Sequence, residues 1–156
     1  MKISKKEFEF WLQYCREMAQ QYNVVRLAVK AARINRMKER QNALDAMGIT
    51  PDKGKELGPV PVVQCVVGTD TFVVVWPEGW LEAIENALEL IAVTFGDNVR
   101  TALEGVYFEK HTRLVACADN DVNYQVFSAV YDKQFLLFMT CLAAHANLLP
   151  SKPNKK

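Results

Sequence analysis

The stretch VVQCVVGTDTFVVVW, residues 62–76, decides the fold class that the sequence predicts. β-Branched and aromatic residues dominate its two halves, VVQCVV (62–67) and TFVVVW (71–76), and the tripeptide GTD separates them. This pattern is typical of a β-hairpin. Apolar residues occupy both faces of each predicted strand. We therefore expect both faces to be covered, either by helices of the same chain or by a partner subunit.

Two helices are predicted before the hairpin. The first spans about residues 5–22, after a capping-box pattern formed by Ser4 and Glu7. Its apolar residues recur at helical spacing and are Phe8, Trp11, Leu12, Cys15, Met18, Ala19 and Tyr22. The second spans about 24–47 and stops at Gly48. Its predicted apolar arc consists of Val24, Leu27, Ala28, Ala31 and Ile34. Asn23 is either a break between the helices or a polar residue within one long helix.

A further helix over about 78–95 is predicted to follow Pro77, because proline suits the first turn of a helix. Its apolar face consists of Trp80, Ile84, Ala87, Leu88, Ile91 and Phe95. A short helical piece over 98–103 follows. The segment from Val106, VYFEKHTRLVACA, reads as a strand, and residues 123–130 as its returning partner, although a helix is possible there. Asp132 is predicted to cap a last helix over about 133–148.

These elements predict an α+β fold. The two hairpins are expected to form one antiparallel sheet, with the N-terminal helical pair, the central helix and the C-terminal helix packed on it. At 156 residues we expect a single domain over 1–149. It would consist of a helical part (1–47), a linker loop (48–61) rich in glycine and proline, and a mixed α/β part (62–149). Residues 150–156 are predicted to form a flexible tail.

Composition favours a globular protein of the cytoplasm. Half of the residues are hydrophobic, the start MKISKKEFEF lacks the apolar stretch of a signal peptide, and no uninterrupted apolar run reaches about 18 residues. The four cysteines form no CxxC pair, and they read as buried thiols in a reducing compartment. We expect no cofactor, no membrane contact and no structural metal.

Opposite charges are separated along the chain. Residues 1–55 contain 12 Lys and Arg against 6 Asp and Glu, whereas residues 70–132 contain 3 against 11. Such asymmetry concerns partners and association rather than fold. Together with the two-sided apolar hairpin, it predicts self-association, most simply as a two-fold homodimer.

The basic part is concentrated in RLAVKAARINRMKER, residues 26–40, where six basic side chains accompany one acid. On a helix, five of them fall within an arc of roughly 120°: Arg26, Lys30, Arg33, Arg36 and Arg40. This face suits an acidic protein partner, a phosphate backbone, or merely solvent. No aromatic residues interleave it, and no nucleic-acid-binding motif accompanies it.

An acidic stripe is its natural counterpart. It consists of Glu78, Glu82, Glu85 and Glu89, at helical spacing on the predicted 78–95 helix. Like charges at this spacing repel each other, so a facing positive surface would stabilise the row. That surface would be the basic helix of the same chain, of another copy, or of a target protein. Alternatively, the stripe only keeps the protein soluble.

The segment after Val106 contains the candidate catalytic and metal-binding groups. On a strand, Tyr107, Glu109, His111 and Arg113 would share one face, so that Glu109 could orient the His111 imidazole. A Cys2His2 zinc set would require His111, Cys117, Cys141 and His145, but their spacing matches no zinc pattern. GxGxxG, GxxxxGK[ST], GxSxG and HExxH do not occur in the chain.

The sequence therefore favours a non-enzymatic binding protein of the inhibitor or adaptor type. It would act by stoichiometric protein–protein contact through the charge-segregated helices. The alternative is a nucleic-acid-binding accessory protein that uses the basic face of helix 24–47. A small enzyme with Glu109 and His111 at its centre is the third hypothesis.

Overall fold

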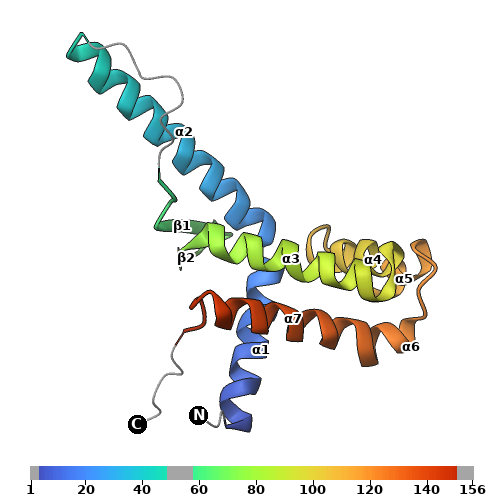
Figure 1. Ribbon diagram of the computed structural model, residues 1–156. Coiled ribbons are helices and arrows are strands. Elements are labelled where there is room, and N and C mark those ends of the chain that lie inside the picture. The colour runs from blue at the N-terminus through green and yellow to red at the C-terminus, as the bar shows by residue number, and fades with distance from the viewer. Residues whose placement is uncertain (1–3, 49–57, 151–156) are drawn as a thin grey trace. The chain divides into compact units, whose positions relative to one another are not determined.

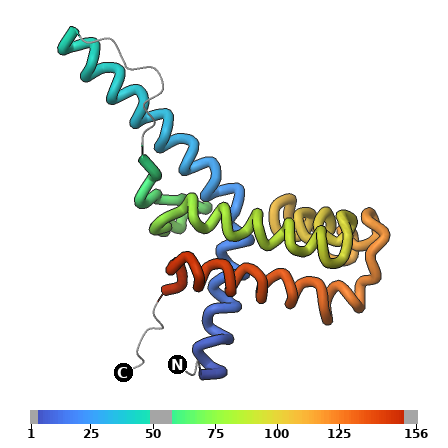
Figure 2. Tube along the Cα trace, viewed as in Figure 1, coloured from blue at the N-terminus to red at the C-terminus, as the bar shows by residue number. Residues whose placement is uncertain are grey.

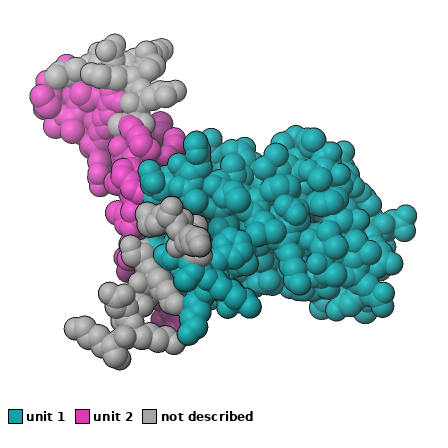
Figure 3. Space-filling view, turned by 60° about the horizontal axis from the view of Figure 1, so that its bottom comes forward, with its two compact units in different colours: residues 1–23, 79–156 teal, residues 24–78 magenta. Residues whose placement is uncertain are grey.

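The computed structural model describes residues 4–48 and 58–150. The chain has an α+β fold that consists mostly of helices, with one two-stranded antiparallel sheet (Figure 1). It divides into two compact units, which Figure 3 colours separately. Unit 1 comprises residues 1–23 and 79–156, and unit 2 comprises residues 24–78. Unit 2 is thus one continuous excursion of the chain between the two segments of unit 1.

The predicted hairpin is confirmed. Strands β1 (Val62–Val67) and β2 (Asp70–Val75) pair in antiparallel register, with Val62 opposite Val75 and Val67 opposite Asp70. Gly68 has a φ of +61°, which a residue without a Cβ adopts at no steric cost in a tight turn. The linker prediction (48–61) falls largely on residues 49–57, outside the described part of the chain, as do residues 151–156 of the predicted tail.

The first two helices are α1 (Lys5–Gln20) and α2 (Tyr22–Ala46). Ser4 caps α1, since its hydroxyl accepts a 3.1 Å hydrogen bond from the backbone N–H of Glu7. The break lies at Gln21. Asn23 is therefore a helical residue, and its amide donates to the carbonyl of Phe108 at 2.8 Å.

Unit 1 is completed by α3 (Pro77–Phe95, from Gly79 onward), α4 (Asp97–Tyr107), α5 (Arg113–Asp119), α6 (Tyr124–Val126), the π-helical turn η1 (Phe127–Tyr131) and α7 (Asp132–His145). Its core is built from the predicted apolar faces. The most deeply buried large side chains include Trp80, Ile84, Leu88, Ile91, Phe127, Phe135 and Met139. Helices α1 and α7 cross in contact with each other (Figure 1). The hydroxyl of Thr140 lies 3.5 Å from the thiol of Cys15 at this crossing.

The prediction of a second hairpin is wrong. Residues 106 and 107 complete α4, residues 113–119 form α5, and residues 124–131 form α6 and η1. The strand predicted to begin at Val106 is instead the end of a helix, and burial gives the reason. Four residues of α4 are buried at helical spacing, so its buried face continues past residue 103: Val99, Ala102, Leu103 and Tyr107. The predicted sheet therefore consists of β1 and β2 alone within the described residues.

The expected cap at Asp132 is also wrong. Tyr124–His145 runs as one continuous helix, which Figure 2 follows from orange to red. Asp132 lies inside this helix and only 2% of its surface is exposed. By length and composition the helix could cross a membrane, a test that the core helix of a soluble protein passes as well. Phe127, Phe135 and Met139 of this helix are fully buried within the protein.

Candidate functional surfaces and a buried carboxylate cluster

The basic face of α2 divides into exposed and engaged residues. Arg26 and Lys30 are exposed. Arg33 donates from Nε to Oε1 of Glu78 at 2.6 Å. Arg36 donates from Nη1 to the carbonyl of Gly58 at 2.9 Å, and Arg40 is half-buried with a partner of its own. The cations in the second half of this arc therefore have contacts within the protein.

The apolar arc of α2 is not where the periodicity predicted it. Val25 and Val29 are buried at 1% and 6% exposure. Leu27 and Ile34 were expected to pack, but they are 56% and 43% exposed, and Ala31 between them is exposed as well. Leu27, Ala31 and Ile34 are spaced by four and three residues and so follow one another along one face of the helix. We call these three residues the α2 stripe.

One face of the hairpin is also exposed and apolar. Alternation along the strands places Val63, Cys65 and Val74 on the buried face. The opposite face presents four valines that are 49–62% exposed, together with two uncharged polar residues. Its members, which we call the hairpin face, are Val62, Gln64, Val66, Thr71, Val73 and Val75. The expectation that both faces are covered thus fails for this face in the single chain.

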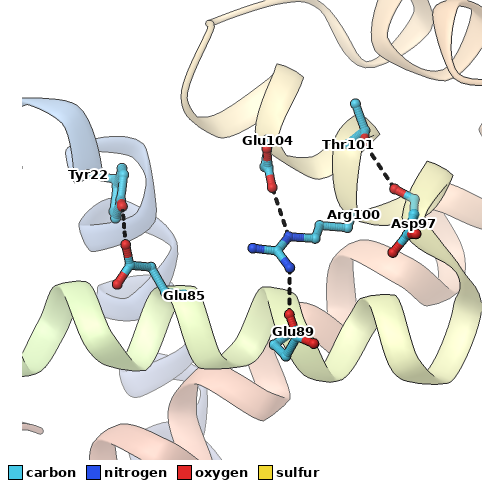
Figure 4. A network of polar contacts seen from close by, with 7 residues as sticks. All are labelled: Tyr22, Glu85, Glu89, Asp97, Arg100, Thr101 and Glu104. Atoms are coloured by element: carbon cyan, nitrogen blue, oxygen red, sulfur yellow. Dashed lines mark hydrogen bonds and ion pairs between the residues drawn. The ribbon is translucent and has the colours of Figure 1, made fainter.

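Three of the four glutamates predicted as an acidic stripe have partners inside their own unit. Glu78 pairs with Arg33 in unit 2. In unit 1, the Tyr22 hydroxyl donates to Glu85 at 2.6 Å, and Arg100 bridges Glu89 at 2.7 Å and Glu104 at 2.9 Å (Figure 4). Glu82 is exposed. The row of like charges is therefore largely compensated by residues of the chain itself.

Glu109 and His111 are brought together, although not on a strand. Both lie in the turn between α4 and α5, where Nδ1 of His111 is 3.5 Å from Oε2 of Glu109. Both side chains are exposed, at 63% for Glu109 and 44% for His111. The pair is open to solvent, and the structure does not enclose it.

The four residues of the candidate zinc set are in different environments. Cys117 is buried, whereas His111, Cys141 and His145 are exposed. Among the described residues, no group of three or more His, Cys, Asp or Glu side chains could hold a metal ion. Burial raises the pKa of the Cys117 thiol and raises that of Cys15 to about 11.

A buried carboxylate cluster in unit 1 was missed by sequence reasoning. Asp132 of α7 accepts a 2.5 Å hydrogen bond on Oδ1 from the hydroxyl of Tyr107. Its Oδ2 lies 3.3 Å from Nη1 of Arg16 and 3.2 Å from Nη2 of Arg113. The cluster therefore ties together α1, α4, α5 and α7. Burial, and after it the negative charge of Asp132, raises the pKa of Tyr107 well above its usual range.

The helix widens into a π-helical turn directly before this carboxylate. η1 ends at Tyr131, and Asp132 is the next residue. Such turns are uncommon and are found frequently at functional sites. An aspartate within the apolar segment 126–143 was the signal available in the sequence, because a charge on a buried helix face requires partners.

No protein-family model matches the chain, and neither the curated proteins nor the solved structures contain a significant match. The features of the chain that bear on its function are the two exposed surfaces of unit 2 and the buried cluster of unit 1.

Proposed function

We propose that the chain is a non-enzymatic binding protein, of the adaptor or inhibitor type, that docks a protein partner on α2. The observation that carries the proposal is the α2 stripe, an exposed apolar row on a helix whose residues 26–38 contain five cations and no acid. An exposed apolar row of this kind is typical of a helix that pairs with a second amphipathic helix, as in coiled-coil zippers. The acidic stripe of α3 supports the proposal less, since Glu78, Glu85 and Glu89 already have partners.

Charge complementarity selects the partner. Arg26 and Lys30 are exposed along one side of the α2 stripe. Lys38 is exposed one turn beyond Ile34, in line with the stripe. A complementary surface would present aliphatic side chains bordered by carboxylates. The proposed partner therefore presents an acidic amphipathic helix.

Two other classes of target are less well matched by the same surface. Helices that lie in a membrane interface usually bury tryptophan or phenylalanine, and the α2 stripe has no aromatic residue. A nucleic-acid backbone would need several free cations, and Arg33, Arg36 and Arg40 have contacts within the protein. Both targets serve as outcomes of the test.

The test uses a synthetic helical peptide with leucines on one face and glutamates beside them, titrated into the labelled protein by fluorescence anisotropy. Binding should weaken roughly tenfold or more in Ile34→Asp and in Lys30→Glu. A peptide with lysine in place of glutamate should bind much more weakly. The matched controls are Val93→Asp and Lys133→Glu, because Val93 is 77% exposed on α3 and Lys133 is exposed on α7.

Equal affinity for the acidic and the basic peptide, or equal loss in the control variants, would contradict the proposal. So would preferential binding to anionic vesicles, or to duplex or single-stranded nucleic acid with a steep dependence on salt that Arg33→Glu with Arg36→Glu abolishes.

A further inference from the structure

The cluster around Asp132 holds two cations against one carboxylate. Arg16 comes from α1, and Arg113 is the first residue of α5. Both guanidinium groups reach the same oxygen, Oδ2, while Tyr107 occupies Oδ1. With the carboxylate ionised, the cluster carries two positive charges and one negative charge. No other acid lies within ion-pair distance of either arginine in the described part of the chain.

Most of the hydrogen-bonding capacity of the two arginines is unused. A guanidinium group has five N–H donors in a fixed planar fork. Among the described residues, Arg113 makes one hydrogen bond, to Asp132, and Arg16 makes only the ion pair with Asp132. None of the described residues has a fully buried side-chain nitrogen or oxygen without a partner. The free donors are therefore open to solvent, in agreement with exposed fractions of 29% for Arg16 and 36% for Arg113.

Asp132 holds the two guanidinium groups close together and leaves their solvent-facing N–H donors unoccupied. The carboxylate itself is 2% exposed, so it contacts the arginines from the protein interior. Two guanidinium groups would repel each other without that carboxylate between them. Holding the donors in place before a ligand arrives removes part of the entropic cost of binding. The π-helical turn η1 ends at the residue directly before Asp132.

We infer that Arg16 and Arg113 form an oxyanion-binding site in unit 1, which takes a carboxylate or a phosphate group. Both groups match the planar fork of arginine and neutralise the excess positive charge. Asp132 is a positioning residue, because it acts through the arginines and is too buried to contact the ligand. The site is independent of the protein-docking surface proposed for α2.

The experiment is a titration of the full chain with inorganic phosphate and, separately, with acetate, at constant ionic strength maintained with sodium chloride. The readout is the NMR signal of each arginine Nε–Hε group. Signals of Arg16 and Arg113 should shift along a saturating curve, and that of Arg100 should not. The better of the two anions identifies which source of oxyanion the site prefers.

Variants separate this site from general charge attraction. Arg16→Gln and Arg113→Gln should each weaken binding by roughly tenfold or more. Arg16→Lys keeps the charge but lacks the planar fork, so it should bind more weakly than the wild type while remaining folded. The control is Arg100→Gln, which removes a surface arginine of the same unit. The inference is overturned if neither anion gives a saturating shift, or if Arg100→Gln loses as much affinity as Arg113→Gln.

Discussion

The hydroxyl of Tyr107 donates a 2.5 Å hydrogen bond to Oδ1 of Asp132, and both residues are 2% exposed. Tyr107→Phe removes the donor and leaves a buried carboxylate oxygen without it. We expect the free energy of unfolding to fall by about 1.5–3 kcal/mol, since the acceptor is charged. Urea denaturation measures the change. Tyr124→Phe serves as the control, because Tyr124 is 46% exposed, and it should change stability by less than about 0.5 kcal/mol.

Asp132→Asn should be more damaging than the loss of Tyr107. It leaves Arg16 and Arg113 close together without their counter-charge. Because these side chains are 29% and 36% exposed, solvent screens their repulsion, and we expect a loss of about 3 kcal/mol, at the lower end of the range for breaking a buried ion pair from one side. The exposed Asp119 provides the control through Asp119→Asn. Thermal unfolding of both variants tests the prediction, and a melting temperature of Asp132→Asn equal to that of the control would contradict a structural role for this carboxylate.

The surface ion pair between Arg33 and Glu78 should contribute little to stability. Arg33 is 54% exposed and Glu78 is 23% exposed, so solvent screens the attraction between them. Arg33→Gln and Glu78→Gln should each cost less than about 1 kcal/mol. A double-mutant cycle should give a coupling energy below about 1 kcal/mol that decreases as salt increases. A larger coupling that salt does not change would show that the pair is effectively buried.

The thiol of Cys15 makes stability depend on pH in the alkaline range. Burial raises its pKa from the ordinary 9.0 to about 11, although the hydrogen bond from Thr140 partly opposes this rise. The folded state therefore keeps a proton that the unfolded state releases first. The stabilisation is complete below pH 9 and is lost as the pH rises toward 11, at roughly 1.4 kcal/mol per pH unit.

The measurement compares the free energy of unfolding at pH 8 and at pH 10. Cys15→Ala should lower stability at pH 8 because of the cavity it leaves, but its further decrease at pH 10 should be about 1 kcal/mol smaller than that of the wild type. Cys141→Ala removes an exposed thiol, so its free energy of unfolding should decrease between pH 8 and pH 10 by as much as that of the wild type. Parallel pH dependence in all three proteins would refute the assignment to Cys15.

The homodimer stays a prediction, and the hairpin face supports it. This face carries no charge, so a second copy of itself is a complementary surface that leaves no charge unpaired. A row of exposed valines is also unusual on a sheet face in water. Val66→Lys and Val73→Lys should shift the protein from dimer to monomer in analytical ultracentrifugation, whereas Val93→Lys on α3 should not. A wild-type protein that is monomeric at all concentrations would exclude this use of the face.

The spacing of apolar residues predicts those elements in which the spacing stays the same from end to end. The hairpin, α1 and α3 were located within one or two residues for this reason. It failed between 124 and 131, where the wider π-helical turn displaces the apolar residues from a regular helical repeat, so that NYQVFSAV resembled a strand. It failed on α2 because the helix has apolar residues on two faces, and sequence spacing alone does not tell which of Val25 and Leu27 is buried.

The candidate surfaces were only partly predictable for a related reason. The charges of Arg33 and Glu78 are visible in the sequence. Their pairing is not, because the two residues are 45 positions apart and meet only when the chain folds back. The cluster around Asp132 requires four helices to meet, and no local pattern encodes such a meeting.

The crossing of α1 with α7 has a consequence for biosynthesis. Thr140 follows Cys15 by 125 residues, so a ribosome working at roughly 5–20 residues per second needs about 6–25 s to produce the partner of α1 after α1 itself. During this interval the apolar side of the nascent α1, with Cys15, Met18 and Ala19, has no α7 to cover it. Unit 1 therefore completes the contact between its first and last helices only after most of its chain has been translated.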